Sequence, residues 1–224
     1  MLFFTVSSNH GGFFMRHLIF KICLGLGSVL LTVPVSFATV GGKSYIELLG
    51  YEAKDQKLYL LKHNEDASGR LPQLYYFDFK SAQPDHLVTV ESIYPKNSNG
   101  EIDHFSHGND IAFERELKKI TRRLKKLYPI NPNIFNINVE KQETLQVPAW
   151  AYPEKTMPEY RYDYTVQNRA YHSQVQQAVS YAPNLEVTQA FRIPKQDRIV
   201  VTVEYLGFPD ETMYTDEDAV ILSK

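Results

Sequence analysis

The sequence predicts an α+β domain built mainly from antiparallel β-strands, with one strong and one weaker amphipathic helix. Strand-forming segments separated by polar turns occur near both ends of the chain, as is typical of antiparallel sheets. One long segment, 110–128, carries apolar residues at helical spacing. Hydrophobic residues make up 43% and aromatic residues 13% of the 224, which is the composition of a globular protein and not of a disordered one.

The first 38 residues have the features of a cleavable signal peptide. A short basic region with Arg16 and Lys21 precedes a mostly apolar run, 22–33, and the small-residue pattern that ends at Ala38 fits a signal peptidase site. About twelve apolar residues are too few to cross roughly 30 Å of hydrocarbon as a helix. We therefore expect cleavage near Ala38, with Met15 as a more ordinary translation start; an uncleaved membrane anchor is the alternative.

Cleavage would leave a single soluble domain, 39–224, in the periplasm or outside the cell. This domain contains no cysteine, because Cys23 lies in the leader, so we expect neither disulfides nor a zinc site made of thiolates. It keeps 22 Lys and Arg against 26 Asp and Glu. This balance gives no reason to expect a nucleic acid partner.

The first part of the domain is expected to form strands. Four segments are rich in aromatic and apolar residues, and polar turns or loops separate them; they are 45–51, 57–62, 73–79 and 87–93. The first two read as a hairpin around the polar turn 53–56.

The strong helix is expected over 110–128. Asp110 or Asn109 can cap its start by accepting a free backbone N–H, and Pro129 ends it. Apolar residues recur at steps of three and four and share one face; they are Phe113, Leu117, Ile120, Leu124 and Leu127.

The rest of the domain is expected to contain strands and one weaker helix. The helix is predicted over 170–181, before Pro183, on a thin apolar stripe. Alternating residues predict strands, two of them in a hairpin; the strand segments are 135–140, 160–166, 185–193 and 198–206. A Pro-rich extended connection is expected over 148–158, and an acidic tail from Asp210 to Asp218.

One part of the chain resembles a known group of proteins. The strand 46–51, the turn at Asp55, the loop through Gly69 and Pro72, and Tyr75-Tyr76-Phe77-Asp78 are similar to segments of bacterial predicted secreted proteins of unknown function. The resemblance covers mainly residues 45–80. It implies bacterial export and no particular activity or site.

Basic residues crowd the outer face of the strong helix. They are Arg115, Lys118, Lys119, Arg122, Arg123, Lys125 and Lys126. Such a face could contact an acidic partner, or anionic lipid head groups at about 1 kcal/mol per cation. Two plainer interpretations stay open: a solvated face partly neutralised by Glu114, or a dock for the acidic tail.

Aromatic residues gather between 150 and 181. The candidates for partner binding are Trp150, Tyr160, Tyr162 and Tyr164. Tyrosine and tryptophan contact a glycan or protein at low entropic cost. The plainer interpretation is packing within the domain, because tyrosines on one strand face commonly pair across a sheet.

A polar loop before the helix holds candidate metal ligands. His104 and His107, with Asp103 beside them, could bind zinc, copper or nickel, but their spacing matches no established zinc protease motif. The loop carboxylates Glu101, Asp103 and Asp110 are the candidates for a hydrolase acting on cell-wall sugar or peptide.

No catalytic signature is found in the sequence. It lacks the serine elbow, the phosphate-binding glycine loop and the dinucleotide fingerprint. The leading hypothesis is therefore an exported, non-catalytic protein without a cofactor that binds another envelope component, protein or glycan, through its basic or aromatic surface. The alternatives are the cell-wall hydrolase and a metal-handling protein; the oligomeric state is left open.

Overall fold

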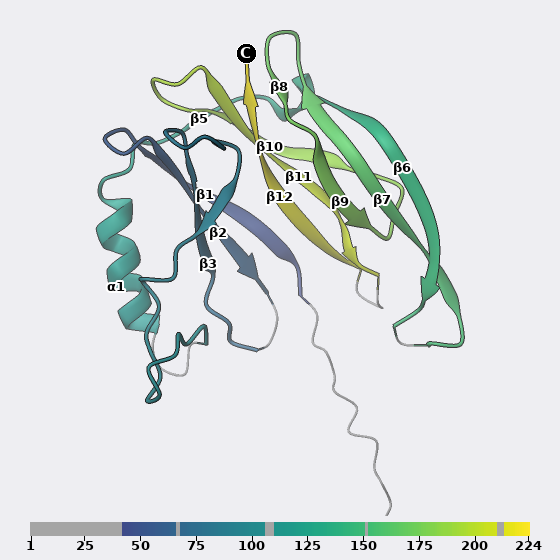
Figure 1. Cartoon of the computed structure of the whole chain (residues 1–224), viewed down its shortest axis with the longest axis horizontal. Coiled ribbons are helices and arrows are strands. Elements are labelled where there is room, and N and C mark those ends of the chain that lie inside the picture. Colours follow the sequence, from purple (N-terminus) through teal and green to yellow (C-terminus); the bar gives the residue numbers. More distant parts are fainter. Residues whose placement is uncertain (1–41, 66–67, 106–109, 151, 210–212) are drawn as a thin grey trace, which may run out of the picture. The chain divides into compact units, whose positions relative to one another are not determined.

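The structure, a computed structural model, describes residues 42–65, 68–105, 110–150, 152–209 and 213–224 (Figure 1). All of them belong to the unit Thr39–Lys224. The predicted signal peptide, with Met15 and Cys23, lies outside the described residues. Among the helices that the structure describes, none is long and apolar enough to cross a membrane.

The first part of the domain forms a four-stranded antiparallel sheet, as predicted. The strands follow one another in chain order and are β1 (Ser44–Glu52), β2 (Lys57–Asn64), β3 (Gln73–Asp78) and β4 (Leu87–Thr89). The β1–β2 turn contains Gln56 in the left-handed region, with φ of 54°. The fourth strand is shorter than the predicted 87–93.

The second part forms an eight-stranded antiparallel sheet in the order β5-β10-β11-β12-β8-β7-β6, with β9 paired to β7. Its strands are β5 (Tyr128–Pro129), β6 (Asn136–Pro148), β7 (Thr156–Gln167), β8 (His172–Ser173), β9 (Gln176–Ser180), β10 (Glu186–Arg192), β11 (Arg198–Phe208) and β12 (Tyr214–Ser223). A short 3-10 helix, η1 (Pro132–Ile134), precedes β6. The prediction of a mainly antiparallel β protein is confirmed.

The strands β10 to β12 form the middle layer of the domain, because both of their faces are covered. On one face, Ile199, Val201 and Val203 of β11 pack with Tyr162 and Tyr164 of β7. On the other face, side chains of β11 and β12 pack with β1, β2 and β3; this cluster includes Val200, Ile221, Ile46, Leu58 and Phe77. Burial on both faces explains why residues 199–203 read as an almost continuous apolar run.

The helix α1 (Asp110–Thr121) covers the remaining face of the four-stranded sheet. Phe113 and Leu117 are its buried residues, and they pack with Leu61 and Leu74 of the sheet. The prediction of a helix reaching residue 128 is wrong at the C-terminal end. After Thr121 the chain turns, as the bonds from Arg123 N–H to the Ile120 carbonyl (3.0 Å) and from Leu124 N–H to the Thr121 carbonyl (3.1 Å) show.

The helix ends early because the following segment pairs with β1. The N–H of Lys125 donates to the Tyr51 carbonyl at 2.9 Å, and the N–H of Tyr51 donates to the Lys125 carbonyl at 3.0 Å. Gly50, with φ of 139°, permits this approach, since a Cβ there would lie 2.7 Å from the Lys125 carbonyl oxygen. Tertiary pairing therefore overrides the helical periodicity of Leu124 and Leu127.

The prediction of a weaker helix over 170–181 is wrong, because this segment forms β8 and β9. Ala178 and Ser180 are buried while Val179 between them is exposed, which is the alternation of a strand. Ala178 lies opposite Tyr162 and Ser180 opposite Tyr160 in the register with β7. Among the residues that the structure describes, α1 is the single α-helix.

The predicted acidic tail also has a different structure. Residues 210–212 lie outside the described residues, but Asp216, Glu217 and Asp218 belong to β12, which pairs with β11 along its length. Asp216 forms an ion pair with Lys62 of β2 at 2.8 Å. The interpretation in which these three acids dock on the basic helix is therefore wrong for them.

Candidate functional site

The basic segment 115–126 is the candidate site that the structure leaves most accessible. Its first half lies on α1, whose apolar side is buried on the sheet, so that Arg115, Lys118 and Lys119 point to solvent. Its second half is the turn after the helix, where Arg122 and Lys126 are also exposed. One continuous stretch of chain thus presents the predicted cations on the surface.

Only part of this positive charge is neutralised within the domain. Glu116 binds Lys119 at 2.8 Å and Arg115 at 3.3 Å. The Lys119 hydrogen bond, and secondly that of Arg115, lowers the pKa of the Glu116 carboxyl. The expected pair between Glu114 and Lys118 is absent from the ion pairs of the described residues.

Arg123 has a structural partner. Its guanidinium lies 3.3 Å from the carboxylate of Glu52, which is 5% exposed at the end of β1. The hydroxyl of Tyr59 donates to the same carboxylate at 3.5 Å. Burial, with the nearby Glu52 charge as the second cause, raises the pKa of Tyr59 to about 12. Arg123 therefore compensates a buried carboxylate, which would be costly if left unpaired.

Four cations of the segment remain without a carboxylate in ion-pair range, within the part of the chain that the structure describes. They are Lys118, Arg122, Lys125 and Lys126. Since the backbone pairing of Lys125 with Tyr51 fixes the turn, these charges stand on an ordered part of the molecule.

A groove of about 850 Å³ runs beside the basic segment, between α1 and the strands β1 and β2. Its apolar lining comes from Leu49, Leu61 and Leu117, of which the last two are buried. Its charged lining has acids at the start of α1 and on β1, and cations further along the helix: Asp110, Glu114, Glu47, Arg115 and Lys118. His63 of β2 also lines it and contacts the Glu47 carboxylate at 2.9 Å. Ile111, which is 81% exposed, lies at the same groove. An apolar lining with charges of both signs suits an extended or helical polypeptide segment.

The structure places the four aromatic candidates in two different environments. Tyr162 and Tyr164 lie in the core, with Tyr164 fully buried, and Tyr160 is half-buried against the same cluster. Burial raises the pKa of the Tyr164 hydroxyl above its usual value. These tyrosines pack the domain and present no platform to a partner, whereas Trp150 is 52% exposed and contacts the Phe208 ring edge-on at 5.9 Å.

The candidate metal and hydrolase residues are not brought together in the described part of the loop. His107 lies outside the described residues. The His104 ring packs against Tyr94 at 4.8 Å, and Asp103 accepts the N–H of Phe105 at 3.0 Å. Glu101 is held by Asn97. Among the described residues, no group of three or more His, Cys, Asp or Glu could hold a metal ion.

The comparisons with known proteins do not assign a function, so any assignment rests on the geometry described above. No protein-family model, no curated protein and no solved structure matches the chain.

Sequence reasoning located the cations of this site and missed the groove. Leu49 and Leu61 belong to predicted strands, and Leu117 to the predicted helix, but the spacing that predicts these elements does not say that α1 crosses the face of β1 and β2 that carries these leucines. The available signal was the second apolar face of β2, where Tyr59 and Leu61 alternate with Leu58 and Leu60. A strand that is apolar on both faces requires a cover on each.

Proposed function

We propose that this chain is an exported, non-catalytic protein that binds an acidic polypeptide segment of another cell-envelope component. Binding uses the basic segment 115–126 and the groove beside α1. The observation that carries the proposal is that Lys118, one of the four unpaired cations of the segment, lines an apolar groove. The compartment in this proposal rests on the signal peptide that the sequence of residues 1–38 predicts.

The lining of the groove favours a polypeptide over a lipid surface. An anionic membrane would oppose Asp110 and Glu114, which line the same groove as Arg115 and Lys118. A polypeptide can place apolar side chains against Leu49 and Leu61 and acidic ones against the cations. Charge complementarity of this kind increases the association rate and discriminates among partners.

Photo-crosslinking in the envelope tests the proposal. A benzophenone side chain replaces Ile111, which is exposed at the groove, and Lys96 in the loop before α1 serves as the control position. We expect a polypeptide adduct from position 111 only, and the crosslinked peptide should combine acidic and apolar residues. Adducts at both positions or at neither would contradict the proposal.

A charge-reversal variant adds the electrostatic test. Lys118→Glu, Arg122→Glu and Lys126→Glu together should lower the yield of the adduct about tenfold, because rim charges control encounter with the partner. The matched control, Lys54→Glu, Lys96→Glu and Arg169→Glu, changes the net charge equally at other exposed positions. A different result would establish the membrane surface as the partner instead. In that case no protein adduct forms, the wild type binds phosphatidylglycerol vesicles, and the charge-reversal variant of the basic segment does not.

A further inference from the structure

The strand β6 is a long strand at the end of the eight-stranded sheet. This strand of 13 residues pairs with β7 on one side, with Glu140 left out of the register at a bulge. Its other side makes no backbone hydrogen bond with any described strand. The opposite end of the sheet is β5, which has two residues. A long edge with unpaired backbone groups is a template for another strand, and proteins usually protect such edges.

The edge strand β1 of the other sheet shows what a protected edge looks like in this molecule. The N–H of Ile46 donates to the buried carboxylate of Glu217 at 2.8 Å, and the Ile46 carbonyl accepts from the side chain of Gln189 at 3.2 Å. Lys125 pairs with Tyr51 further along. In the described part of the chain, no side chain or segment covers the edge of β6 in this way. The backbone groups on its open side can therefore pair with another strand.

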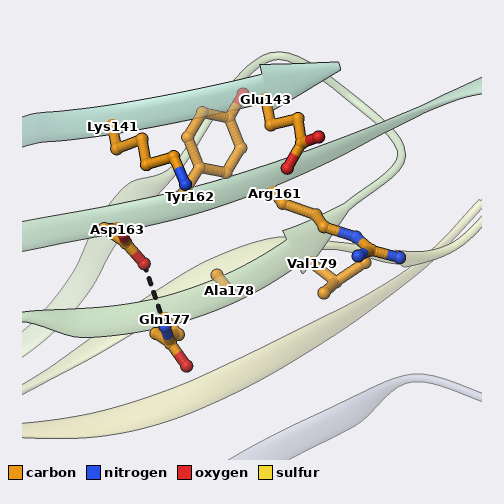
Figure 2. Close-up of a pocket in the computed structure, with 8 residues that line it drawn as sticks. All are labelled: Lys141, Glu143, Arg161, Tyr162, Asp163, Gln177, Ala178 and Val179. Carbon is orange, nitrogen blue, oxygen red and sulfur yellow. Dashed lines mark hydrogen bonds between the residues drawn. The ribbon is translucent and has the colours of Figure 1, made fainter. Parts of the chain in front are cut away.

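Two opposite charges on β6 lack ion-pair partners in the described part of the domain. Lys141 lies opposite Asp163 and Glu143 opposite Arg161 in the register with β7. Figure 2 shows these four side chains around a polar hollow of about 290 Å³. Asp163 accepts instead from Gln177 at 3.0 Å, and Arg161 pairs with Glu159 at 2.8 Å. Lys141 and Glu143 therefore make no ion pair within the described residues.

We propose that β6 pairs antiparallel with β6 of a second copy of this chain, about a two-fold axis at Gln142. In that register Lys141 of one copy lies opposite Glu143 of the other, and the same pair occurs again by symmetry. Lys141 and Glu143 are two residues apart and share a sheet face. Directly opposite residues of an antiparallel pair have Cβ atoms about 4.5–5.5 Å apart, which is within ion-pair reach for these side chains.

The charge order favours a second copy over an unrelated strand. A two-fold interface requires a surface that is complementary to itself. When the triplet Lys141-Gln142-Glu143 pairs antiparallel with the same triplet of a second chain, each charge lies opposite a charge of the other sign. Gln142 then lies opposite Gln142 of the second chain. The bulge between Val139 and Lys141 bends the strand just before this triplet. It therefore limits the length of the pairing. The association closes at a dimer because the two-fold pairing uses the open edge of β6 in both copies.

Sedimentation velocity of the full chain over a range of concentrations tests the pairing, with circular dichroism to establish that each variant is folded. The wild type should show a monomer–dimer equilibrium. Lys141→Glu alone and Glu143→Lys alone should each weaken it about tenfold or more, since two opposite-charge pairs become like-charge pairs.

Two complementary arrangements should restore the dimer. The double variant with both changes recovers both pairs. An equimolar mixture of the two single variants forms a heterodimer, in which the two carboxylates of one variant face the two ammonium groups of the other. A monomeric wild type, single variants that associate like the wild type, or a mixture that stays monomeric would each overturn the proposal. A chain whose edge serves a different protein would give the first of these results.

Discussion

The strands β11 and β6 belong to one sheet and differ in every aspect of their surroundings. β11, with 11 residues, lies between β10 and β12 and is covered on both faces, so that Ile199 to Val203 are all buried. β6, with 13 residues, has one neighbour, and its residues from Asn138 to Thr144 are exposed. The first strand holds three layers of the domain together. The second contributes little to that core and keeps its backbone available.

This contrast indicates that different parts of the domain determine its stability and its binding to partners. Substitutions in the middle layer should act through packing, and they should affect the whole domain. Substitutions in β6, or on the basic face of α1, should leave folding largely unchanged and alter association.

Ile199→Ala in β11 should destabilise the domain by about 2–5 kcal/mol, because it removes buried methyl groups and leaves a cavity. Ile199 is 2% exposed and belongs to the cluster between β11 and β7. The free energy of unfolding in urea, followed by circular dichroism, measures the loss.

Val139→Ala in β6 is the matched control for this core substitution. Val139 is 43% exposed, so the same class of truncation should change stability by no more than about 0.5 kcal/mol. Equal losses at the two positions would show that β6 is part of the core and would remove the contrast.

β11 could be predicted from the sequence and β12 could not, because the two strands differ in their apolar content. The run from Ile199 to Tyr205 is apolar and rich in β-branched residues, and the turn at Pro194-Lys195 precedes it, so the hairpin with β10 could be predicted. The first half of β12 contains Asp216, Glu217 and Asp218, which read as an exposed tail. Asp216 and Glu217 have partners far away in sequence, Lys62 and Ile46, and such partners cannot be inferred from one chain. Asp218 accepts from Tyr205 of the neighbouring strand β11.

The same limit applied to the candidate site. The exposed cations of α1 followed from the helical spacing of Phe113 and Leu117. Which cations stay unpaired did not follow, because Arg123 reaches Glu52, 71 positions earlier in the chain. The prediction that tyrosines of the aromatic segment bind a partner was wrong for a different reason. Its alternation correctly gave a strand, but whether Tyr162 and Tyr164 faced solvent or core depended on β11, which lies across from them.

Glu217→Ala should destabilise the domain by about 1–3 kcal/mol, the usual cost of leaving buried polar groups without partners. Glu217 is 4% exposed. It accepts the N–H of Ile46 at 2.8 Å and the hydroxyl of Thr188 at 3.1 Å. The variant therefore opens the protected edge of β1 and makes it more like β6.

Hydrogen exchange of the Ile46 amide and urea unfolding measure this change together. Glu140→Ala is the control, since Glu140 is an exposed carboxylate of β6 that accepts a long hydrogen bond from Thr165, at 3.4 Å. Its removal should stay within about 0.5 kcal/mol. A Glu217 variant as stable as this control would mean that solvent reaches the β1 edge.

The smallest effect is expected at Asp218 of β12, and it depends on pH. Burial raises the pKa of the Asp218 carboxyl above its usual value, although Tyr205 donates a hydrogen bond to it at 2.8 Å. Because the folded state holds this proton at a pH where the unfolded chain has released it, the contribution of Asp218 to stability falls as the pH rises from about 4 through the folded pKa. Asp218→Asn stays neutral and still accepts the Tyr205 hydrogen bond, so its melting temperature relative to wild type should increase from pH 4 to pH 7. Asp197→Asn, in an exposed turn, controls for loss of a surface carboxyl. If the difference in melting temperature between Asp218→Asn and wild type is the same at both pH values, the half-buried Asp218 does not carry the charge cost that distinguishes it from the exposed acids of β6.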